Sequence, residues 1–66
     1  MLKIKKESKE STSVYNLAEI SRKTGLAYKT VFDVVKNETE CRKATAYLIT
    51  KAFDSEAEII DYFDVV

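Results

Sequence analysis

Apolar residues recur at intervals of three and four over most of the chain, the spacing that gathers side chains on one face of a helix. The pattern predicts a first helix over residues 13–24, which Gly25 ends because glycine tolerates the left-handed conformation of a helix C-cap. After a turn at 25–27, inward-facing valines predict a second helix from Tyr28 to Lys36. Three possible N-cap residues precede the first helix: Ser11, Thr12 and Ser13.

The second half of the chain predicts two further helices after the polar loop "KNETE". One spans about Cys41 to Phe53 and carries a second apolar stripe, which is more than a single buried face needs. The other is short and begins in "DSEAEIIDYF", where Ser55 and Glu58 fit a capping box. The last residues, "DVV", are apolar enough to pack on the domain or to contact a partner.

The first ten residues differ from the rest because their apolar side chains stop at Ile4. A basic arm or a short strand through Leu2–Lys5 fits this pattern better than a helix, and a disordered terminus is the alternative. We therefore divide the chain into an arm or strand, residues 1–12, and a helical domain, residues 13–66. Four short helices with brief loops predict an all-α fold, a small four- to five-helix bundle. The predicted core comprises Val14, Leu17, Ile20, Leu26, Val31, Val34, Val35, Ala46, Ile49, Phe53, Ile60 and Phe63.

At 66 residues the chain forms one domain with a small core, which excludes large enzyme architectures. It contains no histidine, so histidine-based triads and zinc sites are excluded. Cys41 is the single cysteine, which offers neither a metal-ligand set nor a partnered nucleophile. Asp61 and Asp64 lie three residues apart, but such a pair on a short surface helix is typically solvated. We expect no enzymatic activity, no metal site and no cofactor.

The sequence also gives an expectation about compartment. No apolar run approaches the ~20 residues of a membrane-spanning helix, and "MLKIKK" is too short for a signal peptide. A lone cysteine that cannot form an internal disulfide fits a reducing compartment. We expect a cytoplasmic protein that does not bind membranes.

The net charge of the chain is zero, but its two halves differ in sign. Residues 1–36 carry eight basic and four acidic side chains, a net charge of +4. Residues 37–66 carry three basic and seven acidic side chains, a net charge of −4. The first half is therefore suited to phosphates, and the second half repels them.

The residues around Gly25 fit a helix-turn-helix, which is the most specific pattern in the sequence. The two helices of this motif cross steeply, so the turn needs a glycine, and a small residue is needed where the helices touch. Ser21, four positions before Gly25, is the small residue. Apolar residues flank the turn and anchor the second helix: Ile20, Leu26, Val31 and Val34.

The stretch "LAEISRKTGLAYKTVFDVVKN" resembles the helix-turn-helix of Cro/CI-type phage regulators, the XRE-like family, and "TGLAYKTVFDVVKN" is also similar to the LacI headpiece. The continuation "CRKATAYLITKAFDSEAEIIDYF" resembles the later helices of small Cro/CI-like proteins. This resemblance covers residues 13–64 and implies a lambda-repressor-like domain that places the helix from Tyr28 in the DNA major groove, usually as a dimer. Two features depart from the family: residues 3–10 lack the apolar face of a first helix, and Ala27 replaces the usual Ser or Thr cap.

If the valines of the second helix point inward, six residues face a partner: Ala27, Tyr28, Lys29, Phe32, Asp33 and Lys36. Lys29 can donate to guanine or phosphate, and Tyr28 can contact a thymine methyl group or a phosphate. Asp33 suits DNA only opposite a cytosine amino group, whereas Phe32 can contact thymine, anchor a protein interface or pack into the bundle. A possible backbone-contacting arm, or alternatively a solvated terminus, comprises Lys3, Lys5, Lys6 and Lys9.

Three functions are consistent with these features. The first is a Cro-like transcriptional repressor that binds operator DNA as a homodimer, because one small monomer reads few base pairs. The second is a phage antirepressor that binds a CI-type repressor protein through the same surface in a 1:1 heterocomplex, a function that Phe32 and Asp33 favour. The third is the antitoxin of a toxin–antitoxin pair, although this chain leaves little room for a toxin-binding extension.

Overall fold

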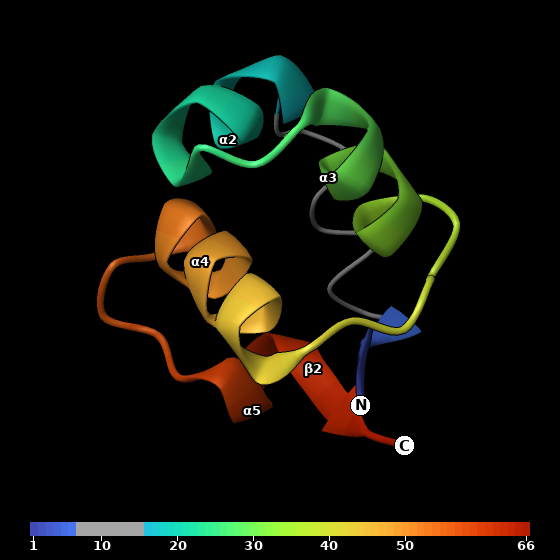
Figure 1. Ribbon diagram of the computed structural model, residues 1–66. Coiled ribbons are helices and arrows are strands. Elements are labelled where there is room, and N and C mark those ends of the chain that lie inside the picture. Colours follow the sequence, from blue (N-terminus) through green and yellow to red (C-terminus); the bar gives the residue numbers. More distant parts are fainter. Residues whose placement is uncertain (7–15) are drawn as a thin grey trace.

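The first and last residues of the chain pair with each other, so the two termini lie side by side (Figure 1). A computed structural model describes residues 1–6 and 16–66. Most of these residues are helical, and a small antiparallel sheet joins the two ends of the chain. In chain order the elements are β1 (Leu2–Ile4), α2 (Leu17–Thr24), α3 (Tyr28–Val35), α4 (Lys43–Phe53), α5 (Ile59–Tyr62) and β2 (Phe63–Val65).

The prediction of an all-α fold is wrong, because β1 and β2 form a two-stranded antiparallel sheet. Its register places Leu2 opposite Val65. On the other edge of β1, Leu2 exchanges two backbone hydrogen bonds with Cys41, at 2.8 and 2.7 Å. Each strand has only three residues, which is too short for the alternation of apolar and polar positions to be recognised. The alternative of a short strand through Leu2–Lys5 agrees with β1.

Helix α2 begins at Leu17, later than predicted, because Asn16 is its N-cap. The side-chain oxygen of Asn16 accepts a hydrogen bond from the backbone N–H of Ala18 at 2.9 Å. The helix ends as predicted at Gly25, whose φ of 76° is left-handed and whose N–H donates to the carbonyl of Ser21 at 2.9 Å. Four residues with predicted roles lie outside the described part of the chain: Ser11, Thr12, Ser13 and Val14.

The next two helices agree with their predictions except at one end. Helix α3 begins at Tyr28, and Lys36 is its C-cap. Helix α4 begins at Lys43 rather than at Cys41, because Cys41 is held in extended backbone by its hydrogen bonds to Leu2. The bridge to β1 therefore determines where α4 can start.

The capping box of α5 consists of Glu58 and Asp61, so the prediction of Ser55 and Glu58 is wrong. The backbone N–H of Glu58 donates to the carboxylate of Asp61 at 2.9 Å. Ser55 belongs instead to the loop between α4 and α5, where its carbonyl accepts from the ammonium of Lys51 at 3.2 Å. The same ammonium donates to the carbonyl of Ala57 at 2.8 Å. Lys51 therefore fastens this loop to α4.

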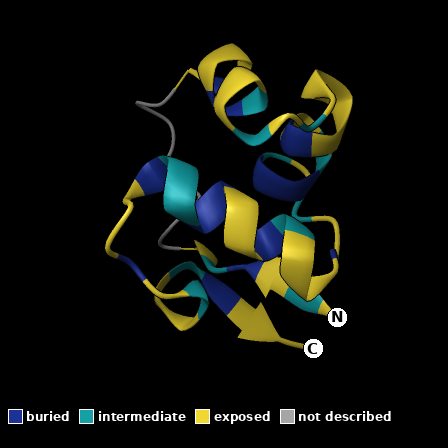
Figure 2. Cartoon of the chain, turned by 60° about the vertical axis from the view of Figure 1, so that its left-hand side comes forward, coloured by how far each residue is buried: buried dark blue, intermediate teal, exposed yellow. Residues whose placement is uncertain are grey.

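One hydrophobic core lies between the helices and the sheet, and Figure 2 shows buried and exposed residues alternating along α4. The prediction that Ile60 is buried is wrong, because its side chain is 72% exposed, whereas Ile59 is half-buried against the core. Leu26 is half-buried, and Ile4 and Ala57 are buried although they were not predicted. The buried hydrophobic residues are Ile4, Leu17, Ile20, Val31, Val34, Val35, Cys41, Ala46, Ile49, Phe53, Ala57 and Phe63.

Candidate nucleic-acid interface

The turn between α2 and α3 is held by side-chain hydrogen bonds as well as by its glycine. The hydroxyl of Ser21 donates to the carbonyl of Leu26 at 2.5 Å, which ties the end of α2 to the start of α3. The hydroxyl of Thr24 donates to the carbonyl of Ile20 at 2.8 Å and accepts the N–H of Leu26 at 3.2 Å. Ser21 is therefore more than the small residue that the motif requires, and Thr24 was missed because its contacts appear only once the turn is formed.

Three valines fix how α3 is rotated about its own axis. Val31, Val34 and Val35 are at most 3% exposed and pack in the core with Leu17 and Ile20 of α2. Burying these positions leaves the opposite side of the helix in solvent. The first turn of α3 has no side-chain cap, because its N-cap is Ala27. The N–H groups of that turn are therefore available to an external acceptor such as a phosphate.

Two aromatic side chains dominate the outward side of α3. Tyr28 is 52% exposed and Phe32 is 39% exposed, and their rings stack with centroids 6.4 Å apart. Phe32 is therefore exposed on α3 rather than packed into the bundle, one of the alternatives considered for it. Ala27 and Lys29 are exposed beside this pair, whereas Lys36 is half-buried at the far end of the helix.

Asp33 is occupied by contacts within its own segment. Its carboxylate accepts a hydrogen bond from the side-chain amide of Asn37 at 3.0 Å, and its carbonyl accepts the N–H of Thr39 at 3.0 Å. These bonds direct Asp33 toward the loop after α3 rather than toward Tyr28 and Lys29. The Asp33–Asn37 spacing of four residues was visible in the sequence, and it is the signal that indicates this pairing.

The helix-turn-helix carries a modest excess of positive charge. Residues 16–37 contain four basic and two acidic side chains, a net charge of +2. Lys23 and Glu19 form an exposed ion pair at 3.5 Å. Among the described residues, neither Arg22 nor Lys29 has an ion-pair partner, and both side chains are exposed. Arg22 was not among the predicted contact residues, although it is exposed, as Lys29 is, and carries the same charge.

The predicted lysine arm is not brought together with the outward side of α3. Lys3 lies in β1 and Lys5 follows it, both on the sheet face opposite the buried Ile4. Lys5 is 3.9 Å from the carboxylate of Asp64, in an ion pair between the two ends of the chain. Lys6 is exposed, and Lys9 lies outside the described residues.

Other chemistry is sparse in the part of the chain that the structure describes. Residues 1–6 and 16–66 contain no group of three or more His, Cys, Asp or Glu side chains that could hold a metal ion. Within the same ranges, no helix has the length and apolar character needed to span a membrane. Cys41 is buried, and this burial raises the pKa of its thiol.

Comparison with known proteins adds no relative: no family model matches the chain, and neither a curated protein nor a solved structure matches it. The likeness to Cro/CI-type regulators therefore rests on the sequence motif.

Proposed function

We propose that the chain is a sequence-specific DNA-binding transcriptional regulator, a Cro-like repressor that inserts α3 into the major groove. The observation that carries the proposal is the outward side of α3, which the bonded turn and the buried valines hold in one orientation. The major groove admits a helix of this kind, and a helix-turn-helix reads bases with the residues near the start of its second helix. Tyr28 and Lys29 occupy those positions.

Each exposed group on this side has a role in such a complex. Lys29 donates to guanine or to a phosphate, and the rings of Tyr28 and Phe32 offer an apolar surface for thymine methyl groups. Arg22 and the uncapped N–H groups at Ala27 face the sugar–phosphate backbone, where they set the register of α3 on the duplex.

The test is a titration of the purified chain, in low and moderate salt, against labelled DNA that flanks its own gene. Lys29→Ala should weaken specific binding roughly 5- to 150-fold, the usual cost of losing one base-reading contact. Lys3→Ala is the matched control because it removes the same charge from the outer face of the sheet, and it should leave the affinity unchanged. Failure to bind any DNA at low salt would overturn the proposal.

The salt dependence gives a second readout. Binding should weaken as salt rises, because phosphate contacts release counterions. The four basic side chains of residues 16–37 allow up to four phosphate contacts per copy, so log K should fall against log salt with a slope no steeper than about −4 per copy. A binding constant that is independent of salt would contradict a phosphate-contacting surface.

The stacked pair of Tyr28 and Phe32 favours a second candidate, an antirepressor that covers the DNA-reading helix of a CI-type repressor in a 1:1 heterocomplex. Exposed aromatic side chains are common anchors of protein interfaces. In this case Phe32→Ala abolishes the heterocomplex, and charge reversal at Asp33 weakens it. DNA binding by the chain itself distinguishes the two candidate functions, because an antirepressor releases a repressor from its operator without binding DNA.

A further inference from the structure

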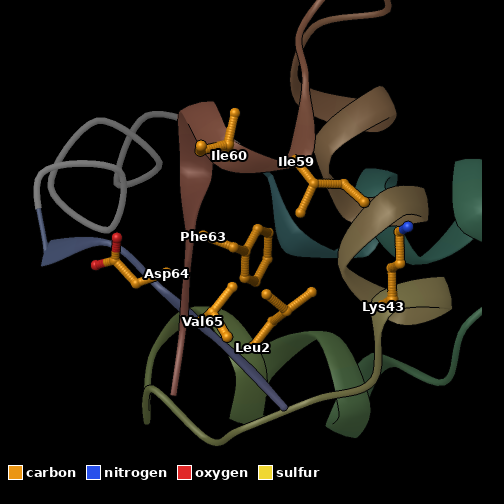
Figure 3. A pocket seen from close by; sticks show the side chains of 7 residues that line it. All are labelled: Leu2, Lys43, Ile59, Ile60, Phe63, Asp64 and Val65. Atoms are coloured by element: carbon orange, nitrogen blue, oxygen red, sulfur yellow. The ribbon is translucent and has the colours of Figure 1, made fainter.

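An apolar hollow lies between β2, α5 and the start of α4 (Figure 3). Its volume is about 420 Å³, within the range of roughly 300–1,000 Å³ that small-molecule pockets occupy. Its apolar lining comes from β1, α5 and β2 and consists of Leu2, Ile59, Ile60, Phe63 and Val65. A mostly apolar lining with few polar groups is typical of a ligand pocket. The hollow therefore has the size and the surface to take a small apolar group.

The floor of this hollow is held in place by the sheet and the core. Phe63 is 1% exposed and packs in the core. Leu2 is fixed on two sides, by its pairing with Val65 and by its hydrogen bonds to Cys41. At the rim, by contrast, Ile60 and Val65 are 72% and 84% exposed. Because the floor is already formed, a ligand can cover these exposed side chains without rearranging the fold.

Two charged side chains lie at opposite margins of the hollow, and only one of them has a partner (Figure 3). The carboxylate of Asp64 is 3.9 Å from the ammonium of Lys5. Lys43 is exposed, and its ammonium has no ion pair or hydrogen bond with any described residue. On the same helix, the ammonium of Lys51 is occupied by two backbone carbonyls. The unbalanced charge at the hollow is therefore the positive charge of Lys43.

A second apolar hollow continues from the same lysine. It runs along the outer side of α4, past Tyr47 and Leu48, and shares Lys43 and Ile59 with the first hollow. Among the described residues, Lys43 is the only charged residue that lines it. The first hollow is the more enclosed of the two. The ammonium of Lys43 thus stands where apolar surface begins, and the first hollow can cover more of a ligand.

We propose that the first hollow binds the anion of a medium-chain carboxylic acid, with its carboxylate at Lys43 and its alkyl chain over Phe63 and Val65. Contact with the apolar lining supplies most of the affinity, because each methylene removed from water tightens binding by up to about fourfold. The ammonium of Lys43 donates to the carboxylate and so fixes the direction of the chain. A doubly charged phosphate fits less well, because Lys43 is a single cation and the carboxylate of Asp64 lies at the other margin.

The shape of the hollow favours a free molecule over a membrane surface. A concave hollow covers one alkyl chain, whereas binding to a membrane surface needs an apolar face that can be inserted among lipids. None of the residues that line the hollow belongs to α3. A ligand there leaves Tyr28 and Phe32 exposed, so the inference goes beyond the proposed function and does not depend on what α3 binds.

The test is calorimetric titration of the full chain with octanoate, at concentrations where octanoate is monomeric, with octanol and octylammonium for comparison. One octanoate should bind per chain, more tightly than either comparison ligand, and hexanoate should bind roughly 5- to 15-fold more weakly because it lacks two methylenes. Octanoate should also raise the Tm of the chain, because it binds only the folded state.

Lys43→Met tests the charge, because methionine keeps an apolar side chain and removes the ammonium. It should weaken octanoate binding roughly 5- to 10-fold, between the values for an exposed ion pair and for a covered hydrogen bond to a charge, and leave octanol binding unchanged. Lys3→Met is the matched control, because Lys3 lies on the sheet face opposite Leu2 and Ile4. It should leave the binding of both ligands unchanged.

Two neighbouring valines test the alkyl chain. Val65→Ser removes apolar contact inside the hollow and should weaken octanoate and octanol alike, by about fivefold. Val66→Ser makes the same change at an exposed valine that does not line the hollow, and it should leave both affinities unchanged. Both valines are exposed, so circular dichroism should show that each variant is folded.

Four outcomes would overturn the proposal. Two concern the ligand: no binding of octanoate to the wild-type chain, or equal affinity for octanoate and octylammonium. The third is an affinity for octanoate that falls as the concentration of the chain rises, which would show that a second copy covers the hollow. The fourth is tighter binding to phosphatidylglycerol vesicles than to octanoate, which would identify a membrane surface as the occupant.

Discussion

Replacing Gly25 by alanine tests the turn on which the position of α3 depends. The φ of Gly25 is 76°, and a Cβ added there would meet no heavy atom within 4 Å. The cost is therefore conformational rather than steric: the left-handed region costs an L-residue roughly 1–2 kcal/mol. Part of this is offset, because alanine restricts the unfolded chain by about 0.4–1 kcal/mol more than glycine does. The net loss of unfolding free energy should be about 1 kcal/mol.

The assay is thermal and urea unfolding followed by circular dichroism, with Gly25→Asn as the control. A loss of this size should lower the Tm of a domain this small by about 4–8 °C. Asparagine tolerates the left-handed region better than alanine, so Gly25→Asn should lose less stability than Gly25→Ala. Equal stability of Gly25→Ala and wild type would refute a left-handed turn at this position. A loss of about 3 kcal/mol or more would refute the open space around it.

Two further predictions concern buried polar groups. Thr50 is fully buried and its hydroxyl has no hydrogen-bond partner among the described residues. Thr50→Val removes this hydroxyl and should raise the unfolding free energy by about 1 kcal/mol, whereas Thr50→Ser keeps the hydroxyl, removes the methyl group and should lower it. A Thr50→Val variant that is less stable than wild type would contradict this. Because burial raises the pKa of the Cys41 thiol, folding favours its neutral form. The stabilisation that the neutral Cys41 thiol contributes should be complete at pH values below the thiol pKa of the unfolded chain. It should decline as the pH rises from that pKa to the higher thiol pKa of the folded chain. Alkylation of Cys41 should be on the order of 100-fold slower than in the urea-unfolded chain, and equal rates would show that the bridge to Leu2 is not maintained.

The helices were predictable where local residues alone determine them. The valines of α3 repeat over more than one turn, so their spacing defines a buried face, and Gly25 ends α2 through its own conformation. Helix α5 is only four residues long, so periodicity could not decide between Ile59 and Ile60. The N-cap at Glu58 sets the rotation of the helix, which turns Ile59 toward the core and leaves Ile60 in solvent.

The sheet was not predictable in the same way, because its two strands come from opposite ends of the chain. The segment from Leu2 to Ile4 has one apolar–polar alternation, and β2 has no more. Only the pairing itself, together with the bridge from Leu2 to Cys41, gives these short segments a fixed backbone. The candidate interface needs the structure too: the sequence analysis placed Asp33 among the residues that face a partner, whereas its bond to Asn37 assigns it to the loop after α3.

The sheet also changes what the charge asymmetry of the sequence means. The basic first half and the acidic second half suggested one end of the molecule for phosphates and another that repels them. Pairing of β1 with β2 instead places Lys5 beside Asp64, so the basic and acidic ends of the chain partly neutralise each other. The positive charge available to DNA is then the local excess on the helix-turn-helix, to which Arg22 and Lys29 contribute. A net charge of zero is compatible with DNA binding for this reason, because phosphates respond to the charges within a Debye length and not to the sum over the whole chain.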